Sequence, residues 1–185
     1  KRKFYHFVSK KCFDMDGLGP KIIDVLLEQG LISTFDDIFT LKRGDLLVLP
    51  RFAEKSVDNL LVSVEKAKKV SLARFIAALS IPQVGEETAH DLSKHFGSIE
   101  KISEAKYEEI ESIYGVGPIV AKSVFDWFRV VDNKKLIKNL LKYVQIEKEK
   151  QGSAISQKLK GKSFVFTGSM NMDRIKAQEI VSNEI

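Results

Sequence analysis

The fold is decided by the segment IYGVGPIVA at residues 113–121, because its pattern recurs three times upstream. The central triplets are GLG at 17–19, RFA at 51–53, QVG at 83–85 and GVG at 115–117, spaced 34, 32 and 32 residues apart. Each triplet separates two apolar stretches. An apolar residue follows each triplet by four positions: Ile23, Val57, Ala89 and Ala121. Repetition at this period predicts one supersecondary unit used four times.

The flanks of the triplets have helical periodicity, as in Leu60, Leu61, Val64 and Ala67. Glycine suits a tight turn between helices, and proline directly after the second glycine suits a first helical turn. We therefore predict an all-α fold of four tandem hairpins, each a helix, a short turn and a helix. Connecting helices are predicted at 34–40, 72–79 and 103–112, and no strand is predicted before residue 160.

A glycine turn that opens a helix has a chemical use. The first N–H groups of a helix lack internal partners and lie at the positive end of its macrodipole, so a phosphate oxygen can bind them. The second triplet has no glycine, and the third retains only its last one. One such turn is more often a plain connection, but four at one period favour DNA backbone binding. The candidate contacts are Gly17, Leu18, Gly19, Lys21, Arg51, Lys55, Val84, Gly85, Gly115, Val116, Gly117 and Lys122.

The composition describes a globular chain of 185 residues, 44% hydrophobic and 30% charged. The net charge is +5, with +3 in residues 1–70, 0 in 71–150 and +2 in 151–185. No apolar run reaches the roughly 18 residues of a membrane span, and Cys12 is the single cysteine, so we expect a cytoplasmic protein. The absence of an initiator Met and the ending VSNEI lead us to expect a fragment.

Catalytic or metal-binding residues are not evident in the sequence. His6, His90 and His95 have no metal-site spacing. Adjacent carboxylates such as Glu86 and Glu87 point about 100° apart on a helix and do not converge on a substrate.

The repeat resembles the helix-hairpin-helix motif, and longer strings extend the resemblance. HFVSKKCFDMDGLGPKIIDVL (6–26), ARFIAALSIPQVGEETAHDLSKHFGSIEKI (73–102) and IYGVGPIVAKSVFDWF (113–128) are similar to the helix-hairpin-helix domain of bacterial NAD-dependent DNA ligase. LKGKSFVFTGSMNMDRIKAQEIV (159–181) is similar to the start of that family's BRCT domain. The resemblance implies a DNA-binding domain at 1–145, a linker at 146–160 and a truncated BRCT domain at 161–185.

The resemblance also implies a function. Such ligases seal nicks in DNA replication and repair with NAD as adenylate donor, and this domain contacts the minor groove around the nick. The adenylated lysine of the family lies in a Lys-x-Asp-Gly motif, which this sequence lacks. We therefore expect no catalytic residue, bound metal or cofactor here, with NAD, Mg and Zn used by the full-length enzyme. The expected partners are nicked duplex DNA and the other ligase domains, with no membrane.

Two alternatives remain open from the sequence. The helical array or the BRCT start can serve protein–protein docking. The chain can also be a subunit of another helix-hairpin-helix repair complex, such as a junction-binding or excision-repair protein.

Overall fold

The computed structural model of the chain describes residues 1–49 and 52–147, which belong to one compact unit, Lys1–Glu149. Arg51, most of the predicted linker at 146–160 and the predicted BRCT start at 161–185 lie outside the described residues. Within the described part no helix is long and apolar enough to cross a membrane.

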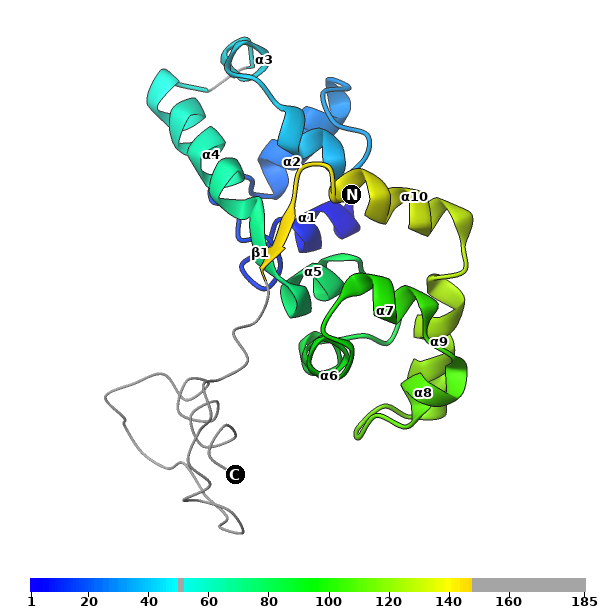
Figure 1. Cartoon of the computed structure of the whole chain (residues 1–185). Helices are drawn as coiled ribbons and strands as arrows, with labels where there is room; N and C mark the ends of the chain where they lie inside the picture. The colour runs from blue at the N-terminus through cyan, green and yellow to red at the C-terminus, as the bar shows by residue number, and fades with distance from the viewer. Residues whose placement is uncertain (50–51, 148–185) are drawn as a thin grey trace, which may run out of the picture. The chain divides into compact units, whose positions relative to one another are not determined.

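The described unit is mostly helical, as predicted, and its helices are short. In chain order its elements are α1 (Arg2–Phe7), α2 (Pro20–Glu28), the 3-10 helix η1 (Asp36–Thr40), α3 (Arg43–Leu47), α4 (Glu54–Ala67), β1 (Lys69–Ser71), α5 (Leu72–Ala78), α6 (Glu86–Phe96), α7 (Ile99–Glu104), α8 (Tyr107–Glu111), α9 (Pro118–Trp127), α10 (Val131–Leu140) and β2 (Gln145–Glu147). Figure 1 shows α2, α3 and α4 on one side of the unit and α6 to α9 on the other, with α1 and α5 between them.

Local sequence accounts for where several helices begin and end. Ser71 and Ser98 cap α5 and α7, because their side chains accept hydrogen bonds from the amides of Arg74 (3.4 Å) and Lys101 (3.3 Å). Helix α6 ends at Gly97, which adopts a left-handed φ of 70° suited to glycine. Boundaries of this kind depend on neighbouring residues alone, so the sequence predicts them well.

The predicted absence of strands before residue 160 is wrong. Strands β1 and β2 pair in parallel, with Val70 opposite Ile146, and the amide of Gln145 donates to the carbonyl of Lys68 at 2.7 Å. Three-residue strands are too short to show alternation in the sequence, and their pairing depends on a contact between distant segments. The pairing places residues 145–147 beside the start of α5 (Figure 1).

The single connecting helix predicted at 103–112 is two helices, α7 and α8. The chain is extended at Ala105 (φ −58°, ψ 145°) and Lys106 (φ −79°, ψ 156°) between them. Ala105 is buried, so packing of this residue accompanies the break in the helical backbone. Helical periodicity continues through such a break, which is why the sequence does not show it.

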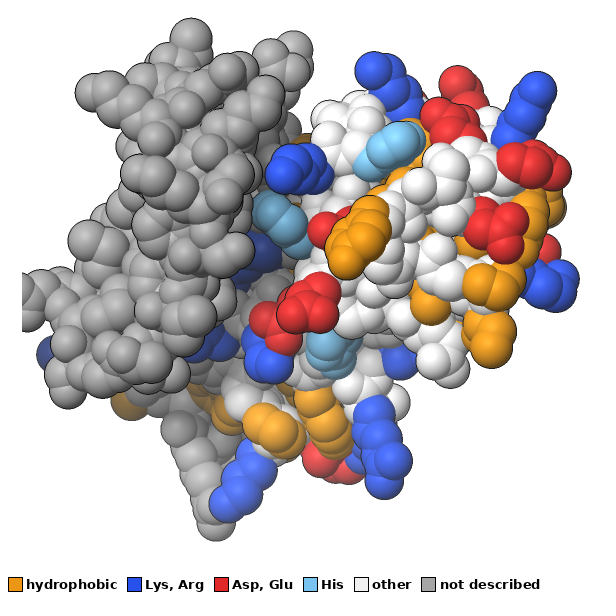
Figure 2. All heavy atoms as spheres, turned by 90° about the horizontal axis from the view of Figure 1, so that it is seen from below, with side chains coloured by type: hydrophobic (Ala, Val, Ile, Leu, Met, Phe, Trp, Pro, Cys, Tyr) orange, Lys and Arg blue, Asp and Glu red, His pale blue; other side chains and the backbone are white. Residues whose placement is uncertain are grey.

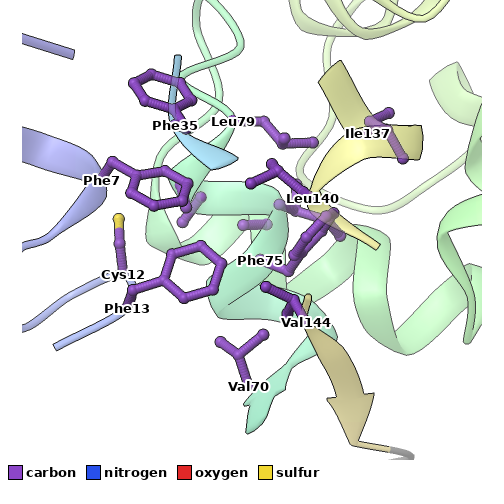
Figure 3. Close-up of a cluster of buried hydrophobic side chains, with 14 of the residues drawn as sticks. Phe7, Cys12, Phe13, Phe35, Val70, Phe75, Leu79, Ile137, Leu140 and Val144 are labelled. Carbon is purple, nitrogen blue, oxygen red and sulfur yellow. The ribbon is translucent and has the colours of Figure 1, made fainter. Parts of the chain in front are cut away.

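A shared hydrophobic core joins the two sides of the unit (Figure 3). The ring of Phe7 stacks on Phe13 and Phe35, with centroid separations of 4.3 and 4.5 Å. Phe75 of α5 packs edge-on to Phe13 at 6.3 Å, and Leu140 of α10 lies in the same buried cluster. The core therefore ties the segment before the first triplet to the helices of the second half.

Candidate nucleic-acid interface

The four triplets share one pattern of backbone hydrogen bonds. In each, the amide of the middle residue donates to the carbonyl three residues earlier. The pairs are Leu18 to Met15 (3.2 Å), Phe52 to Leu49 (3.4 Å), Val84 to Ile81 (3.1 Å) and Val116 to Ile113 (3.0 Å). The carbonyl of the third residue then accepts the first hydrogen bond of α2, α4, α6 or α9, at 2.9 to 3.1 Å. We refer to these segments as the first to fourth turns; they repeat in geometry as well as in sequence.

The middle residue is buried in the first and fourth turns and partly buried in the second and third, and the glycines face outward. Leu18 and Val116 are 2% and 5% exposed, whereas Gly17, Gly19, Gly115 and Gly117 are exposed. Gly17 and Gly115 have φ of 89° and 83°, the left-handed region that glycine adopts without strain. Leu18 and Val116 thus hold the turns against the core, and the predicted phosphate contacts at these turns are backbone amides.

The helix-opening amides of the first and fourth turns are open to a ligand. Gly19 and Gly117 are the N-caps of α2 and α9, and neither helix has a side-chain cap. Among the described residues, the amides of Gly19, Lys21, Gly117 and Ile119 donate to no backbone acceptor. A Cβ built at Gly19 or Gly117 would meet no heavy atom within 4 Å. Donors left free at the positive end of a helix suit an anion such as phosphate.

The predicted cations differ in how they are paired. Lys21 and Lys55 each lie two residues beyond a turn, on α2 and α4, and are exposed; within the described part neither forms an ion pair. Lys122 instead contacts Asp126 at 2.8 Å, and that hydrogen bond raises the lysine pKa. Lys122 therefore keeps its charge but shares it with a carboxylate, so Lys21 and Lys55 are the stronger candidates for phosphate binding.

The third turn has the same backbone and an unfavourable charge. Its N-cap, Gly85, is extended and uncapped by a side chain, but Glu86 and Glu87 occupy the first turn of α6. Glu86 pairs with Lys11, which leaves Glu87 uncompensated among the described residues. Carboxylates in the first turn of a helix interact with the positive end of its macrodipole and repel a phosphate. Val84 and Gly85 lie in the third turn and are the weakest of the candidate contacts.

The third turn also stores backbone strain that a substitution can release. Gln83 has φ of 65° at the position where the first and fourth turns have glycine. A left-handed residue other than glycine costs about 1–2 kcal/mol. We expect Gln83→Gly to stabilise the chain by about 1 kcal/mol after the entropy cost of glycine, measured by urea unfolding. Gln83→Ala, which keeps the strain, is the control, and equal stability of the two variants would contradict this account.

Sequence reasoning missed two exposed apolar residues at the fourth turn. Tyr114 directly precedes Gly115 and is 98% exposed, and Ile119 follows Gly117 by two residues and is 74% exposed. The sequence gives no signal for their exposure, because Ile113 and Val120 beside the same turn are apolar too but are buried or partly buried.

Charge is not segregated on the face of the molecule seen in Figure 2. There Lys and Arg side chains lie among Asp and Glu side chains and apolar patches. Several exposed lysines and arginines are paired, as in Arg43 with Asp58 (2.9 Å) and Lys1 with Asp24 (3.1 Å). Any anion binding therefore depends on individual turns and unpaired lysines more than on one broad basic surface.

A metal centre is not formed by the described residues, in which no group of three or more His, Cys, Asp or Glu side chains is arranged around a common point. His6 Nε2 lies 3.0 Å from the carbonyl oxygen of Ala77 and 3.4 Å from Cys12 Sγ. Cys12 is buried, and burial raises the pKa of its thiol, which favours the unreactive protonated form. The side chains of His6 and Cys12 therefore pack within the fold and contact each other and the backbone.

Comparison with protein families agrees with the turn geometry. Residues 13–66 match a model described as a SAM-like helix-hairpin-helix tandem, and residues 74–137 match a helix-hairpin-helix motif. The first match contains the first and second turns, and the second match contains the third and fourth. The two matches show helix-hairpin-helix motifs in both halves of the described unit and support a DNA-binding domain. These motifs indicate DNA binding that does not depend on base sequence.

Proposed function

We propose that this chain binds duplex DNA by its phosphate backbone, mainly through the amides of the first and fourth turns and through Lys21 and Lys55. The observation that carries the proposal is the pair of uncapped helix N-termini at Gly19 and Gly117, each open to solvent inside a matched helix-hairpin-helix region. Amide donors and lysines hold phosphates without reading bases, so binding is independent of sequence.

The turns lie in pairs, which supports contact with more than one phosphate. Leu60 of α4 packs 3.5 Å from the Cβ position of Gly17, so the helix after the second turn covers the first turn. Ser123 of α9 donates to the carbonyl of Pro82, which links the fourth turn's helix to the third turn. Each pair coincides with one matched region. We propose that all four turns are helix-hairpin-helix units and that two pairs hold phosphates of both strands across the minor groove.

We further propose that the chain is the DNA-binding part of an NAD-dependent DNA ligase and that its preferred substrate contains a nick. The similarity of the strings at 6–26, 73–102, 113–128 and 159–181 to that family supports this proposal. The sequence lacks Lys-x-Asp-Gly, the motif that holds the adenylated lysine in that family. We propose that the adenylation chemistry, with NAD, Mg and Zn, belongs to the full-length ligase.

The test is fluorescence anisotropy of a labelled nicked duplex titrated with the chain at several salt concentrations. Neutralising three to four phosphates lowers affinity about 100-fold between 50 and 200 mM salt. An intact duplex of the same sequence and a scrambled sequence are the controls, and we expect equal affinity for the two sequences and tighter binding to the nick.

Three outcomes of this titration separate the hypotheses. Absence of binding at low salt would overturn the proposed function. An affinity that does not change with ionic strength would favour apolar docking over phosphate contacts. Equal binding to nicked and intact duplexes would leave DNA binding standing and remove the evidence for nick preference.

A further inference from the structure

We infer that the fourth turn binds DNA by a different chemistry from the first: Tyr114 and Ile119 pack against the deoxyriboses beside the phosphate that its amides hold, and so favour DNA over RNA. This inference rests on the proposed function and adds the part of the nucleotide that this turn recognises. Tyr114 and Ile119 flank Gly115 and Gly117 and are 98% and 74% exposed. No hydrogen bond of the Tyr114 hydroxyl is found among the described residues.

Exposure of one apolar side chain is ordinary, but comparison of the repeats makes these two informative. Two residues after each triplet the chain has Lys21, Lys55, Glu87 and Ile119. Directly before each triplet it has Asp16, Pro50, Pro82 and Tyr114. The first and second turns thus place a lysine where the fourth places an isoleucine. The positions two residues after the triplets are equivalent, because the described residues of all four turns make the same hydrogen bonds.

The fourth turn has no unpaired lysine equivalent to Lys21 of the first turn. Lys122, the nearest predicted cation, contacts Asp126 at 2.8 Å on the same helix. Glu111 accepts a hydrogen bond from Tyr107 at 3.1 Å and adds negative charge four residues before Gly115. Free amides at Gly117 and Ile119 remain, so this turn can accept a phosphate but gains little from long-range attraction. Apolar contact is therefore a second source of affinity at this turn, beside the amides.

A nucleotide offers a matching surface beside its phosphate. The deoxyribose presents C–H groups, which an aromatic ring and a branched aliphatic side chain cover with little loss of hydration. Ribose places its 2′-hydroxyl in the wide, shallow minor groove of an RNA duplex, and packing Ile119 or the Tyr114 ring against it would desolvate that hydroxyl without giving it a partner. The arrangement therefore discriminates against ribose where it touches the sugar.

The test compares the whole chain with the double variant Tyr114→Ser/Ile119→Thr. We expect about tenfold weaker duplex DNA binding from the loss of apolar contact, with an unchanged slope of log affinity against log salt. The preference for duplex DNA over the same-sequence RNA duplex should fall in the variant. The A-form geometry of RNA affects both proteins alike, so the change in the DNA-to-RNA affinity ratio isolates the sugar contact.

A matched control removes an equally exposed apolar group elsewhere. Val131 is 78% exposed on α10, and we expect Val131→Thr to bind DNA and RNA as the unaltered chain does. Thermal unfolding followed by circular dichroism checks that the double variant is folded. Because both substituted side chains are exposed, its midpoint should stay within about 2 °C of that of the unaltered chain.

Each outcome decides the inference. If the unaltered chain binds DNA and the double variant binds equally well with the same DNA-to-RNA ratio, the sugar contact is wrong and the proposed function stands. A flatter salt slope in the variant would mean that it lost phosphate contacts, which also overturns the inference. If sedimentation shows a dimer that only the double variant dissociates, Tyr114 and Ile119 form an interface between two copies. If the unaltered chain binds no duplex, the proposed function fails first.

Discussion

Replacing Gly19 and Gly117 together by valine is expected to weaken duplex DNA binding about 100-fold, because hydrogen bonds to a charged phosphate contribute about 1.5–3 kcal/mol each. Both glycines are exposed N-caps, and a Cβ at either position points into open space that a phosphate would otherwise occupy. The added isopropyl groups would hold the phosphate away from the amides of α2 and α9. Anisotropy titration at a single low salt concentration measures the loss.

The same double variant should remain folded, which makes it a sharper test than changing Gly17 or Gly115. Gly19 and Gly117 have φ of −68° and −81° with ψ near 170°, a region that valine adopts readily before proline. The loss of the better cap costs about 1 kcal/mol at each helix. By contrast, Gly17 and Gly115 have left-handed φ, so a side chain there would strain the backbone and confuse binding with stability.

The second turn supplies the matched control. Ala53 is the N-cap of α4 and already has a Cβ at the position of Gly19 and Gly117. We expect Ala53→Val to change affinity for DNA less than threefold, because the N-cap of this turn is not glycine and a Cβ already occupies the space beside its amides. Unchanged DNA binding by the Gly19→Val/Gly117→Val variant, with its fold intact, would show that the turn amides are not the contacts.

The Phe7→Ala variant is expected to lose about 3–5 kcal/mol of its free energy of unfolding, the range for removing a large aromatic side chain from a core. Phe7 is fully buried and stacks on Phe13 and Phe35, so its removal leaves a cavity lined by these two rings. Urea unfolding followed by circular dichroism measures the loss from the shift in midpoint.

A half-buried neighbour gives the control for this variant. Phe4 lies on the same helix and contacts the edge of Phe35 at 4.8 Å, but it is only partly buried. Phe4→Ala should therefore cost less than half as much as Phe7→Ala. If both substitutions cost the same, the burial of Phe7 in the aromatic cluster does not set its contribution to stability.

Features that depend on neighbouring residues could be predicted from the sequence. The first and fourth turns and the helices that they open follow from glycine, proline and apolar spacing. The inward position of Leu18 and Val116, which the sequence offered only as candidate DNA contacts, is seen in the structure. The connecting helix predicted at 72–79 is present as α5 (Leu72–Ala78), and η1 occupies most of 34–40. The outward glycines at 17, 19, 115 and 117 follow the same local logic, because a small residue in a tight turn with an apolar anchor exposes its backbone.

Features that depend on distant segments were decided by the tertiary structure. Two of these features join residues far apart in the chain: the pairing of β1 with β2 and the packing of Leu60 over Gly17. A third, the break between helices at Ala105, accompanies the burial of that residue. Gln83 adopts the left-handed φ that glycine has in the first and fourth turns, although glutamine does not favour this conformation. Exposure of Tyr114 and Ile119 likewise appears only when the core is built, because an apolar residue in a sequence is the same whether packing covers it or leaves it facing a ligand.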